Sequence, residues 1–357
     1  MRKLIIGEPV ELMKVAESTT SIGRFREVIE QHNGGTFAEI KSDGYRIQVH
    51  NNGELAFFTG NLNPLNTEVY PDILGQLKGL PRGIWDGELV GVEGGLRGFN
   101  AVKTRKRQSL DADLIRQYPL EIRFFDILNL EGKNLTELPL QERRRILENY
   151  AGRVSCQWQI ANPYDLEQKF KEVTDELGLE GLVCKNPDSQ YLIGARTRDW
   201  IKLKKFLTLD LVVLGVYRGK GKAAKLPFAA LLLGTANEGN YETLTKVGIS
   251  NRELISRIEA GLAGGYCSEP PTNVRISDAI NKSVYRRKIP SFYICPEKSV
   301  VVEIETMNVT RSANWHSCGL EGGRAYSLRI STVKRYREDK KSVNATTTKQ
   351  VRELYRG

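Results

Sequence analysis

The sequence predicts an α+β fold built on antiparallel sheets, followed by a smaller, β-rich domain. Short β-like runs and helical stretches are intermixed in the first part of the 357-residue chain, without a regular strand–helix–strand repeat. The dipeptides Asp43-Gly44 and Asn52-Gly53 are typical of hairpin turns. From Leu209 onward strands predominate. Together these observations favour antiparallel sheets over a doubly wound parallel fold.

The first part is expected to contain strands whose residues alternate in polarity or are β-branched and aromatic. They cover 37–40, 45–50, 54–58, 84–92 and 121–128. Helices are expected at 22–31, 140–150 and 165–177, the last ended by Gly178. The Asp43-Gly44 pair is expected to turn the first strand back on the second, which would place Glu39 and Lys41 on one face and bring Arg46 beside them.

The second part has the pattern of a small barrel. Strands are expected at 209–217, 228–235, 241–247, 300–307 and 326–332, with one helix at 251–262. Five strands and a helix in about 150 residues are typical of the five-stranded oligonucleotide-binding (OB) barrel. We therefore expect domains at 1–206 and 207–357, with the boundary near Lys205 to Leu209.

The composition limits the class of protein. The net charge of +10 suggests a polyanionic partner, although a lysine-rich solvated surface reaches the same total. No apolar run approaches the roughly 18 residues of a membrane span, and Glu8 and Glu11 interrupt any apolar signal core. We expect a soluble intracellular protein with no secretion signal and no membrane segment.

Two further expectations concern cysteine and arginine. The five cysteines are odd in number and contain no C-x-x-C, so the sequence indicates neither a disulfide framework nor a zinc ribbon. The run Arg143-Arg144-Arg145 falls on a predicted helix and is interpreted as a solvated face, as charge runs usually are.

Lys41 lies in the motif Lys41-Ser-Asp-Gly-Tyr-Arg46. A lysine held among cations has its ammonium form destabilised, and a neutral amine is a competent nucleophile. An ordinary surface hairpin would explain this motif equally well if it stood alone. A catalytic interpretation therefore needs partners elsewhere in the chain.

The stretch after Asp199 offers such partners. The strand period puts Trp200, Lys202 and Lys204 on one face, while Ile201 and Leu203 point into a core. Two lysines side by side repel each other unless an anion such as a nucleotide phosphate lies between them. The alternative is an edge strand protected by lysines.

Three more motifs carry carboxylates, an amine or an aromatic ring. In Glu180-Gly-Leu-Val-Cys-Lys185 a short strand has a carboxylate at its start, which could hold Mg²⁺ near phosphates, and an amine at its end. A glutamate after a helix-ending glycine is the alternative. Asp86-Gly-Glu88 offers Glu88 on a strand, and Phe125 precedes Asp126, although such an aromatic is more often a core residue.

Taken in order, these motifs resemble the covalent nucleotidyltransferase superfamily, and specifically the ATP-dependent DNA ligases. The resemblance covers K-x-D-G-x-R at 41–46, D-G-E at 86–88, F-D-I-L at 125–128, E-G-L-V-x-K at 180–185 and W-x-K-x-K at 200–204. It continues through 211–222 and 246–248 to S-L-R…R-x-D-K at 327–340. Any one match is weak, whereas the ordered set is specific.

The resemblance implies a nucleotidyltransferase (adenylation) domain followed by an OB-fold domain. Lys41 would attack the α-phosphate of ATP to give lysyl-AMP and pyrophosphate. The AMP would pass to the 5′-phosphate of a nick in duplex DNA, and the 3′-hydroxyl would displace it. ATP and Mg²⁺ are the implied cofactors, with Mn²⁺ as the alternative metal, and a monomer is expected. Only 40 residues precede Lys41, so we expect a compact form without a leading DNA-binding domain.

The resemblance also assigns roles to individual residues. It implies Glu39 and Phe125 on adenine and Glu88 near the ribose. Asp43 and Glu180 would hold the metal. Phosphate contacts are implied for Lys185, Lys202 and Lys204, and contacts with AMP or the nick 5′-phosphate for Arg46 and Arg196. Pyrophosphate would be oriented, in the first step only, by Arg337, Asp339 and Lys340. The barrel must then swing, and the 206–210 connection is the expected hinge.

The sequence departs from the family pattern at one position, contains basic loops that could contact DNA, and leaves two alternative functions open. Gly60 stands where the family usually has an arginine. Basic loop residues are candidates for DNA contacts: Lys103, Arg105, Lys106, Arg107, Arg218, Lys220, Lys222, Arg286, Arg287 and Lys288. An RNA ligase or mRNA-capping guanylyltransferase shares the lysine chemistry. A non-catalytic OB-fold protein that only binds nucleic acid is the second alternative.

Overall fold

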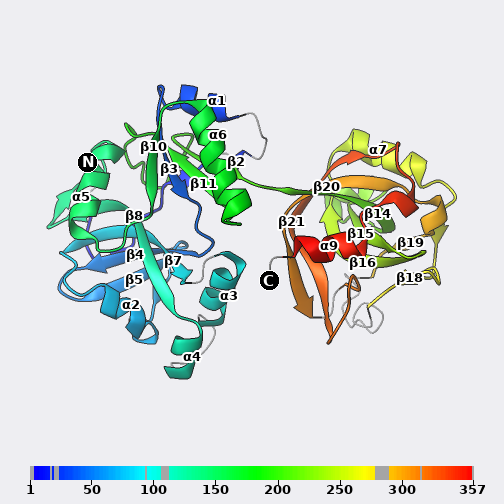
Figure 1. The fold of residues 1–357 in the computed structure, drawn as a ribbon, viewed down its shortest axis with the longest axis horizontal. Coiled ribbons are helices and arrows are strands. Elements are labelled where there is room, and N and C mark those ends of the chain that lie inside the picture. Colours follow the sequence, from blue (N-terminus) through cyan, green and yellow to red (C-terminus); the bar gives the residue numbers. More distant parts are fainter. Residues whose placement is uncertain are drawn as a thin grey trace. The chain divides into compact units, whose positions relative to one another are not determined.

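The computed structural model describes residues 4–16, 18–19, 24–92, 95–105, 112–277, 289–313 and 316–355. The chain forms two compact units, Met1–Lys205 and Phe206–Gly357 (Figure 1). Both units are built mainly from antiparallel strand pairs, with helices packed on them. The predicted α+β class is confirmed.

The first sheet of the N-terminal unit carries Lys41 at the end of one strand. Its order is β10-β3-β11-β13-β2. The strands are β2 (Ser18–Thr19), β3 (Thr36–Ile40), β10 (Gln157–Ile160), β11 (Gly181–Lys185) and β13 (Trp200–Lys204). Helices α1 (Phe25–Gln31) and α6 (Pro163–Lys171) contribute Phe25, Val28, Leu166 and Phe170 to a core shared with this sheet. A π-helical turn, Glu172–Glu176, continues α6, and Gly178 follows with φ 66°.

The second sheet of this unit has the order β6-β5-β4-β7-β8-β9. Its strands are β4 (Tyr45–Asn51), β5 (Leu55–Thr59), β6 (Pro64–Leu65), β7 (Gly83–Gly91), β8 (Leu120–Leu130) and β9 (Lys133–Asn134). The helices of this half are α2 (Pro71–Gln76), α3 (Gly95–Arg105), α4 (Ala112–Gln117) and α5 (Leu140–Tyr150). The hairpin expected at Asn52-Gly53 is confirmed, because Asn51 pairs with Leu55 across it.

The hairpin expected at Asp43-Gly44 is wrong. Strand β3 pairs with β10 and β11, whereas β4 pairs with β5 and β7 in the other sheet. Gly44 is needed for a different reason, since a Cβ on it would lie 2.3 Å from the carbonyl oxygen of Leu89. The glycine lets the connection between the sheets cross directly over β7, and the dipeptide alone does not distinguish that close approach from a turn.

The C-terminal unit contains one curled eight-stranded sheet. The strands are β14 (Leu207–Tyr217), β15 (Ala230–Asn237), β16 (Asn240–Gly248), β17 (Tyr266–Cys267), β18 (Val274–Arg275), β19 (Phe292–Ile294), β20 (Val301–Ala313) and β21 (Arg324–Tyr336). Helices α7 (Arg252–Gly261) and α9 (Thr348–Leu354) close over its core, which is rich in leucine, isoleucine and valine. Because β14 begins at Leu207, most of the expected 206–210 hinge lies in a strand.

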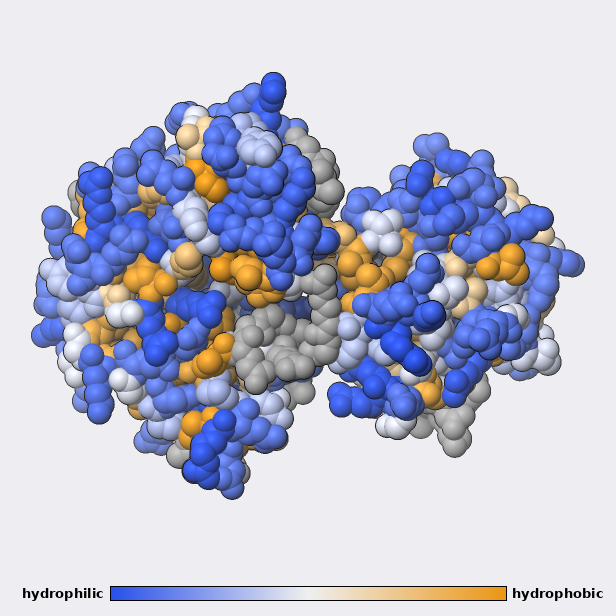
Figure 2. Space-filling model, in the orientation of Figure 1, coloured by the Kyte–Doolittle hydropathy of each residue, from blue (hydrophilic) through white to orange (hydrophobic). Residues whose placement is uncertain are grey.

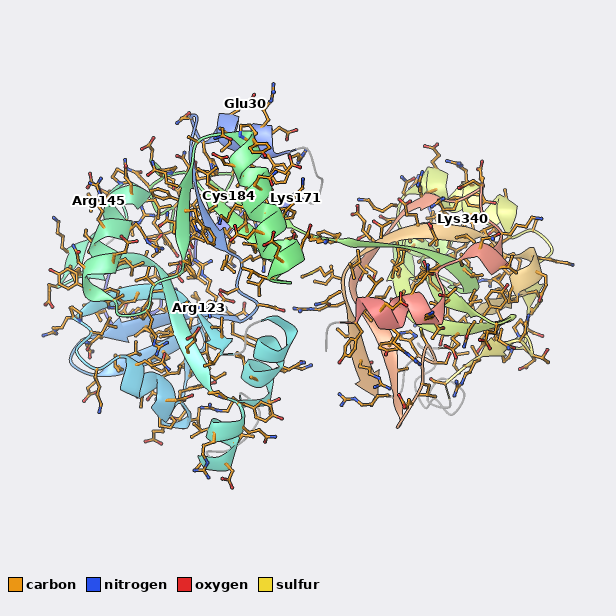
Figure 3. All side chains as sticks on the ribbon, in the orientation of Figure 1. Glu30, Arg123, Arg145, Lys171, Cys184 and Lys340 are labelled. Atoms are coloured by element: carbon orange, nitrogen blue, oxygen red, sulfur yellow. A yellow bond between two sulfur atoms is a disulfide. The ribbon has the colours of Figure 1, made fainter. Side chains whose placement is uncertain are left out.

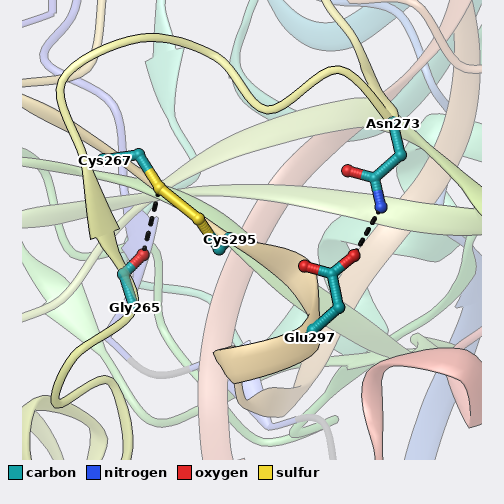
Figure 4. The surroundings of a disulfide bond; sticks show 5 residues. All are labelled: Gly265, Cys267, Asn273, Cys295 and Glu297. Carbon is teal, nitrogen blue, oxygen red and sulfur yellow. Dashed lines mark hydrogen bonds between the residues drawn. A yellow bond between two sulfur atoms is a disulfide. The ribbon is translucent and has the colours of Figure 1, made fainter.

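Two cysteines correct an expectation. Cys267 at the end of β17 and Cys295 after β19 form a disulfide (Figure 4). They are 28 residues apart in sequence, but the pairing of Tyr266 with Ile294 brings their strands together. The spacing of the cysteines in the sequence does not reveal such a bridge, because it depends on which strands pair. Cys156, Cys184 and Cys318 are free thiols.

The surface agrees with the composition. Figure 2 shows hydrophilic side chains over most of the visible face of each unit, with smaller apolar areas between them. Within the described parts of the chain, no helix combines the length and apolar character needed to cross a membrane.

Candidate active site

A cavity of about 330 Å³ is lined by residues of the five- and six-stranded sheets of the N-terminal unit and of a short parallel pair, β1 (Lys14–Val15) with β12 (Arg196–Thr197). The ATP-binding candidates along its walls are Glu39, Lys41, Arg46, Glu88, Phe125, Lys185, Arg196 and Lys202. Lys204, Glu180 and Asp43 are not among the lining residues, although the first two lie next to Lys41. Lys14, Arg123 and Ser155 also line the cavity and were not singled out from the sequence. Residues from Lys14 to Lys202, far apart in the sequence, therefore line one cavity.

Lys41 is held in place by the segment that carries Glu180. Its backbone N–H donates to the carbonyl oxygen of Gly181 at 2.9 Å, and its Nζ donates to Oε2 of Glu180 at 2.5 Å. Gly181 has φ +143°, and a Cβ there would lie 2.0 Å from the carbonyl oxygen of Leu203. Only glycine permits this close approach, which brings Glu180 beneath the Lys41 amine.

Glu180 bridges two lysines. Its second oxygen lies 2.9 Å from Nζ of Lys204. Burial alone would raise the pKa of Glu180, but the ion pairs with Lys41 and Lys204 outweigh it and hold that pKa below its ordinary value. Burial, together with the positive charges of Lys41 and Lys204, lowers the pKa of Lys202. Three lysines, Lys41, Lys202 and Lys204, therefore lie near a single ionised carboxylate, Glu180. The excess of positive charge is what an anion-binding site requires.

The aromatic wall consists of Phe125 on β8 and Trp200 on β13. Nζ of Lys185 lies 4.5 Å from the Phe125 ring centre and 4.6 Å from that of Trp200. The Arg46 guanidinium lies 5.3 Å from the Phe125 ring centre. Phe125 is thus part of the cavity wall, with cations against it, and not only a core residue.

Glu39 is a buried carboxylate with one unsatisfied oxygen. It is only 3% exposed. Its Oε2 accepts from Lys185 Nζ at 2.8 Å and from Ser155 Oγ at 3.1 Å. Its Oε1 has no hydrogen-bond partner, and the nearest cation, Arg144 Nη1, lies 3.5 Å away. A buried acceptor without a donor is costly, so this oxygen suits a ligand that brings an N–H group.

Arg46 is anchored by several acceptors at once. Its Nε and Nη2 donate to the two oxygens of Asp86 at 3.0 and 2.6 Å, and Nη1 donates to the carbonyl oxygen of Met13 at 2.7 Å. The Tyr191 hydroxyl donates to the same Asp86 carboxylate at 2.8 Å. Asp86 and Tyr191 are supporting residues that the sequence reasoning missed. Gly60 lies beside this group, since a Cβ on it would be 3.5 Å from Cβ of Arg46.

The interpretation of the 143–145 arginines as a solvated face is wrong for two of them. Arg143 is completely buried and pairs with buried Asp126, with Nε at 2.8 Å from Oδ1. Arg144 is 7% exposed and donates to the Ser155 hydroxyl at 3.2 Å. Only Arg145 is exposed, on the outer side of α5 (Figure 3). The spacing of the buried residues, 140, 143, 144 and 147, is the i, i+3, i+4, i+7 stripe of a packed helix and was the available signal.

The candidates for DNA contacts differ in exposure. Arg105 is 3% exposed and makes a two-pronged ion pair with Asp72, which argues against a contact with DNA. Lys103, Arg218 and Lys220 are exposed, as the prediction requires. The other loop candidates lie outside the described residues or have side chains that do: Lys106, Arg107, Lys222, Arg286, Arg287 and Lys288. In the C-terminal unit Arg337 and Lys340 both pair with Asp210, and Asp339 pairs with Arg337.

The model of the ATP dependent DNA ligase domain matches residues 13–204, more than half of the chain. The chain belongs to the ATP-dependent DNA ligase family. The matched segment contains every motif residue of the cavity. It ends with the last residue of β13, where Lys204 pairs with Glu180.

Individual relatives agree with this family membership. A probable DNA ligase of Dictyoglomus thermophilum is 32% identical, with 99% of this chain and 61% of the relative covered. DNA ligase 1 of Methanosarcina barkeri is also 32% identical, covering 99% of this chain and 66% of the relative. The chain thus spans less than two thirds of the length of these relatives. A solved structure from a study of Lig E DNA ligases is 18% identical, has a TM-score of 0.57, and matches 92% of this chain and 100% of its own. That likeness supports the predicted fold, a nucleotidyltransferase domain followed by an OB barrel.

Glu88 gives this ligase-family domain a pH-dependent stability. Burial raises the pKa of Glu88 to about 7 against the lowering effect of Lys41 and Arg46, whereas the ordinary value is 4.5. Between these two values the unfolded chain has released the proton and the folded chain retains it. Stability from this group is therefore present at low pH and is lost as pH rises toward 7.

We expect Glu88→Gln to remove this loss. We compare the free energies of unfolding of the two nucleotide-free proteins. The difference, variant minus wild type, should increase by roughly 1 to 3 kcal/mol as the pH is raised from 5 to 8. Urea denaturation at several pH values measures it, with exposed Glu137→Gln as the matched control. Parallel pH profiles for Glu88→Gln and the wild type would contradict the assignment.

Proposed function

We propose that this chain is an ATP-dependent DNA ligase that seals nicks in duplex DNA through lysyl-AMP and DNA-adenylate intermediates. The single observation that carries the proposal is the amine of Lys41, fixed against Glu180 at the mouth of a cavity with an aromatic wall and several cations. Residues 1–206 act as the adenylation domain and 207–357 as the OB-fold domain. The enzyme works as an intracellular monomer.

The first step is a displacement at the α-phosphorus of ATP. The Lys41 amine forms the N–P bond, and the bond to pyrophosphate breaks. Glu180 orients Nζ by accepting its hydrogen bond. In the second step an oxygen of the nick 5′-phosphate takes the AMP from Lys41. In the third step the 3′-hydroxyl attacks that phosphate, and AMP leaves.

The base preference follows from Glu39. Its unsatisfied Oε1 accepts a hydrogen bond from the exocyclic amine of adenine, while the Phe125 ring lies against the base. Guanine has a carbonyl oxygen at the corresponding position, and two acceptors facing each other in a buried site would be unfavourable. This supports ATP over GTP, and therefore a ligase over a capping guanylyltransferase.

Mg²⁺ is the expected metal, and Glu180 fits it. An ionised carboxylate is the hard oxygen ligand that Mg²⁺ prefers, and the ion pairs with Lys41 and Lys204 keep Glu180 ionised, with further metal ligands from water and phosphate. When bound, the metal would neutralise charge on the phosphates. Among the described residues no group of three or more acidic, histidine or cysteine side chains forms a protein-only cage. Asp43 remains a proposed second ligand.

The remaining proposed contacts involve phosphates outside the base pocket. Lys185 and Arg196 reach the nucleotide or the nick 5′-phosphate from the cavity wall. In the C-terminal unit, Arg337 and Lys340 bind the β- and γ-phosphates that leave as pyrophosphate. Exposed Arg218 and Lys220 contact the duplex backbone. Lys205 and Phe206, which lie between β13 and β14, allow the two units to change their arrangement between steps.

Two assays test the function. Label from α-labelled ATP, but not from GTP, should become attached to the chain in an acid-stable form. A singly nicked duplex should then be closed in the presence of ATP and Mg²⁺. Labelling from GTP alone would show a guanylyltransferase, and closure of nicked RNA but not of nicked DNA would show an RNA ligase. Salt-sensitive DNA binding without closure would show a binding protein only.

A further inference from the structure

The C-terminal unit contains a charged cluster in which one residue, Asp210, lies outside the ligase motifs quoted for this chain. Arg337 and Lys340 lie on the turn that follows β21, and both point to one carboxylate, Asp210 on β14. Arg337 Nη1 lies 2.8 Å from each oxygen of Asp210, and Lys340 Nζ lies 2.7 Å from Oδ2. A single acidic side chain, 127 residues upstream of Arg337, thus holds the two cations of the turn together.

The three side chains are largely protected from water. The exposed fractions of the Asp210 and Arg337 side chains are 15% and 14%, and that of Lys340 is 31%. Asp339 fixes the other edge of the Arg337 guanidinium, with Nη2 at 2.6 Å from Oδ2, but this carboxylate is 63% exposed. A second sheltered carboxylate, Glu303, lies farther from Arg337, with Oε2 3.6 Å from Nη1. Asp210 is therefore the nearer sheltered partner and the one that also pairs with Lys340, and its ion pairs are screened less than those of an ordinary surface bridge.

The backbone reinforces the arrangement. The N–H of Arg337 donates to the carbonyl oxygen of Val301 at 2.8 Å. The N–H of Asp210 donates to the Thr346 hydroxyl at 3.0 Å, and the N–H of Thr346 donates back to the Asp210 carbonyl oxygen at 2.7 Å. The turn is thereby fixed at both ends to the sheet. Without Asp210, the Lys340 side chain would lose its ion pair with that carboxylate, and Nη1 of Arg337 would keep only the longer contact with Glu303 among the ion pairs described above.

We propose that Asp210 is a positioning residue for the first step of ligation. It holds the Arg337 guanidinium and the Lys340 ammonium at a fixed separation before pyrophosphate is formed. Two flexible cations lose rotamer freedom when they bind phosphate, and a partner that has already ordered them reduces that cost. The inference rests on the proposed function, and it goes beyond it because the ligase motifs quoted for this chain do not include Asp210.

The chemistry makes the proposal specific to one step. The β- and γ-phosphates are present only while ATP reacts with Lys41, and they have left once lysyl-AMP exists. A residue that acts through Arg337 and Lys340 should therefore change lysyl-AMP formation and its reversal by pyrophosphate. It should leave the sealing of an already adenylated nick nearly unchanged. A carboxylate that merely stabilises the barrel would affect both reactions together.

The experiment compares Asp210→Ala and Asp210→Asn in the full chain with the wild type. Single-turnover formation of lysyl-AMP should be about tenfold or more slower in Asp210→Ala, with an intermediate loss in Asp210→Asn, whose amide oxygen still accepts one hydrogen bond. The KM for pyrophosphate in the reverse reaction should rise. Sealing of a pre-adenylated nick, without ATP, should stay within about twofold of the wild type. Glu305→Ala is the matched control, because it removes one carboxylate from a neighbouring strand, where Glu305 pairs with Lys334 at 2.9 Å.

Each outcome decides the question. Equal losses in lysyl-AMP formation and pre-adenylated sealing would overturn the proposal in favour of a structural role. Wild-type rates of lysyl-AMP formation in Asp210→Ala would overturn it as well. If the wild type itself formed no adduct with ATP, the proposed function would fail first, and that result is distinguishable from either of the others.

Discussion

The Lys41→Ala variant is expected to form no acid-stable adduct with α-labelled ATP. The substitution removes the amine proposed to form the N–P bond, which donates to Glu180 Oε2 at 2.5 Å and lines the cavity. Labelling should fall by about a thousandfold or more, to background. A gel of the labelled, acid-treated protein measures it, with Lys133→Ala as the control because Lys133 is exposed on β9.

A second substitution separates the nucleophile from its charge. Lys41→Arg keeps a cation next to Glu180, but a guanidinium stays protonated and does not attack phosphorus. It should therefore be as inactive as Lys41→Ala in adduct formation, while its folding stability stays closer to that of the wild type. Substantial labelling of either variant would mean that another residue carries the AMP, and the proposed mechanism would be wrong.

The motif residues could be predicted because the fold brings their strands together. Lys41 follows β3, while Lys185 and Lys202 lie on β11 and β13, and β11 pairs with both of the other strands. Residue types and order in the chain thus carried most of the information about the cavity. The proposed nucleophile Lys41, its neighbouring cations and the aromatic residue Phe125 needed no three-dimensional information to be singled out.

What could not be predicted depends on pairings between distant segments. Asp43-Gly44 has the local signature of a turn, and only the proximity of β7 shows that Gly44 is needed for close packing. The disulfide depends on the pairing of β17 with β19. Asp210 is 127 residues from Arg337, and nothing in its own surroundings in the sequence marks it as a partner.

The buried arginines of α5 differ from these cases, because their helical spacing did contain the signal. Arg143 and Arg144 share a face with Leu140 and Leu147, and a charge run was interpreted without regard to that period. The correction matters for the site, since Arg144 contacts the Ser155 hydroxyl beside Glu39. Part of the base pocket is therefore held by residues that looked like a solvated surface.

The buried pair of Arg143 and Asp126 leads to the largest expected effect on stability. Both side chains are fully buried, and Arg143 Nη1 also donates to the carbonyl oxygens of Leu138 and Ser189 at 2.5 and 3.0 Å. Arg143→Met would leave the Asp126 carboxylate as an uncompensated charge in the core. We expect the free energy of unfolding to fall by about 3 to 5 kcal/mol, as measured by urea denaturation near pH 7.

Two companion variants identify the cause. Arg145→Met changes the neighbouring exposed arginine and should alter stability by less than about 0.5 kcal/mol. The double variant Asp126→Leu/Arg143→Met removes the stranded charge, so it should be more stable than Arg143→Met, although the lost arginine hydrogen bonds to the Leu138 and Ser189 carbonyl oxygens prevent full recovery. Because Asp126 adjoins Phe125 on β8, the single variant should also bind ATP more weakly than the double variant. If Arg143→Met were no more destabilising than Arg145→Met, the ion pair between Arg143 and Asp126 would not stabilise the fold as argued.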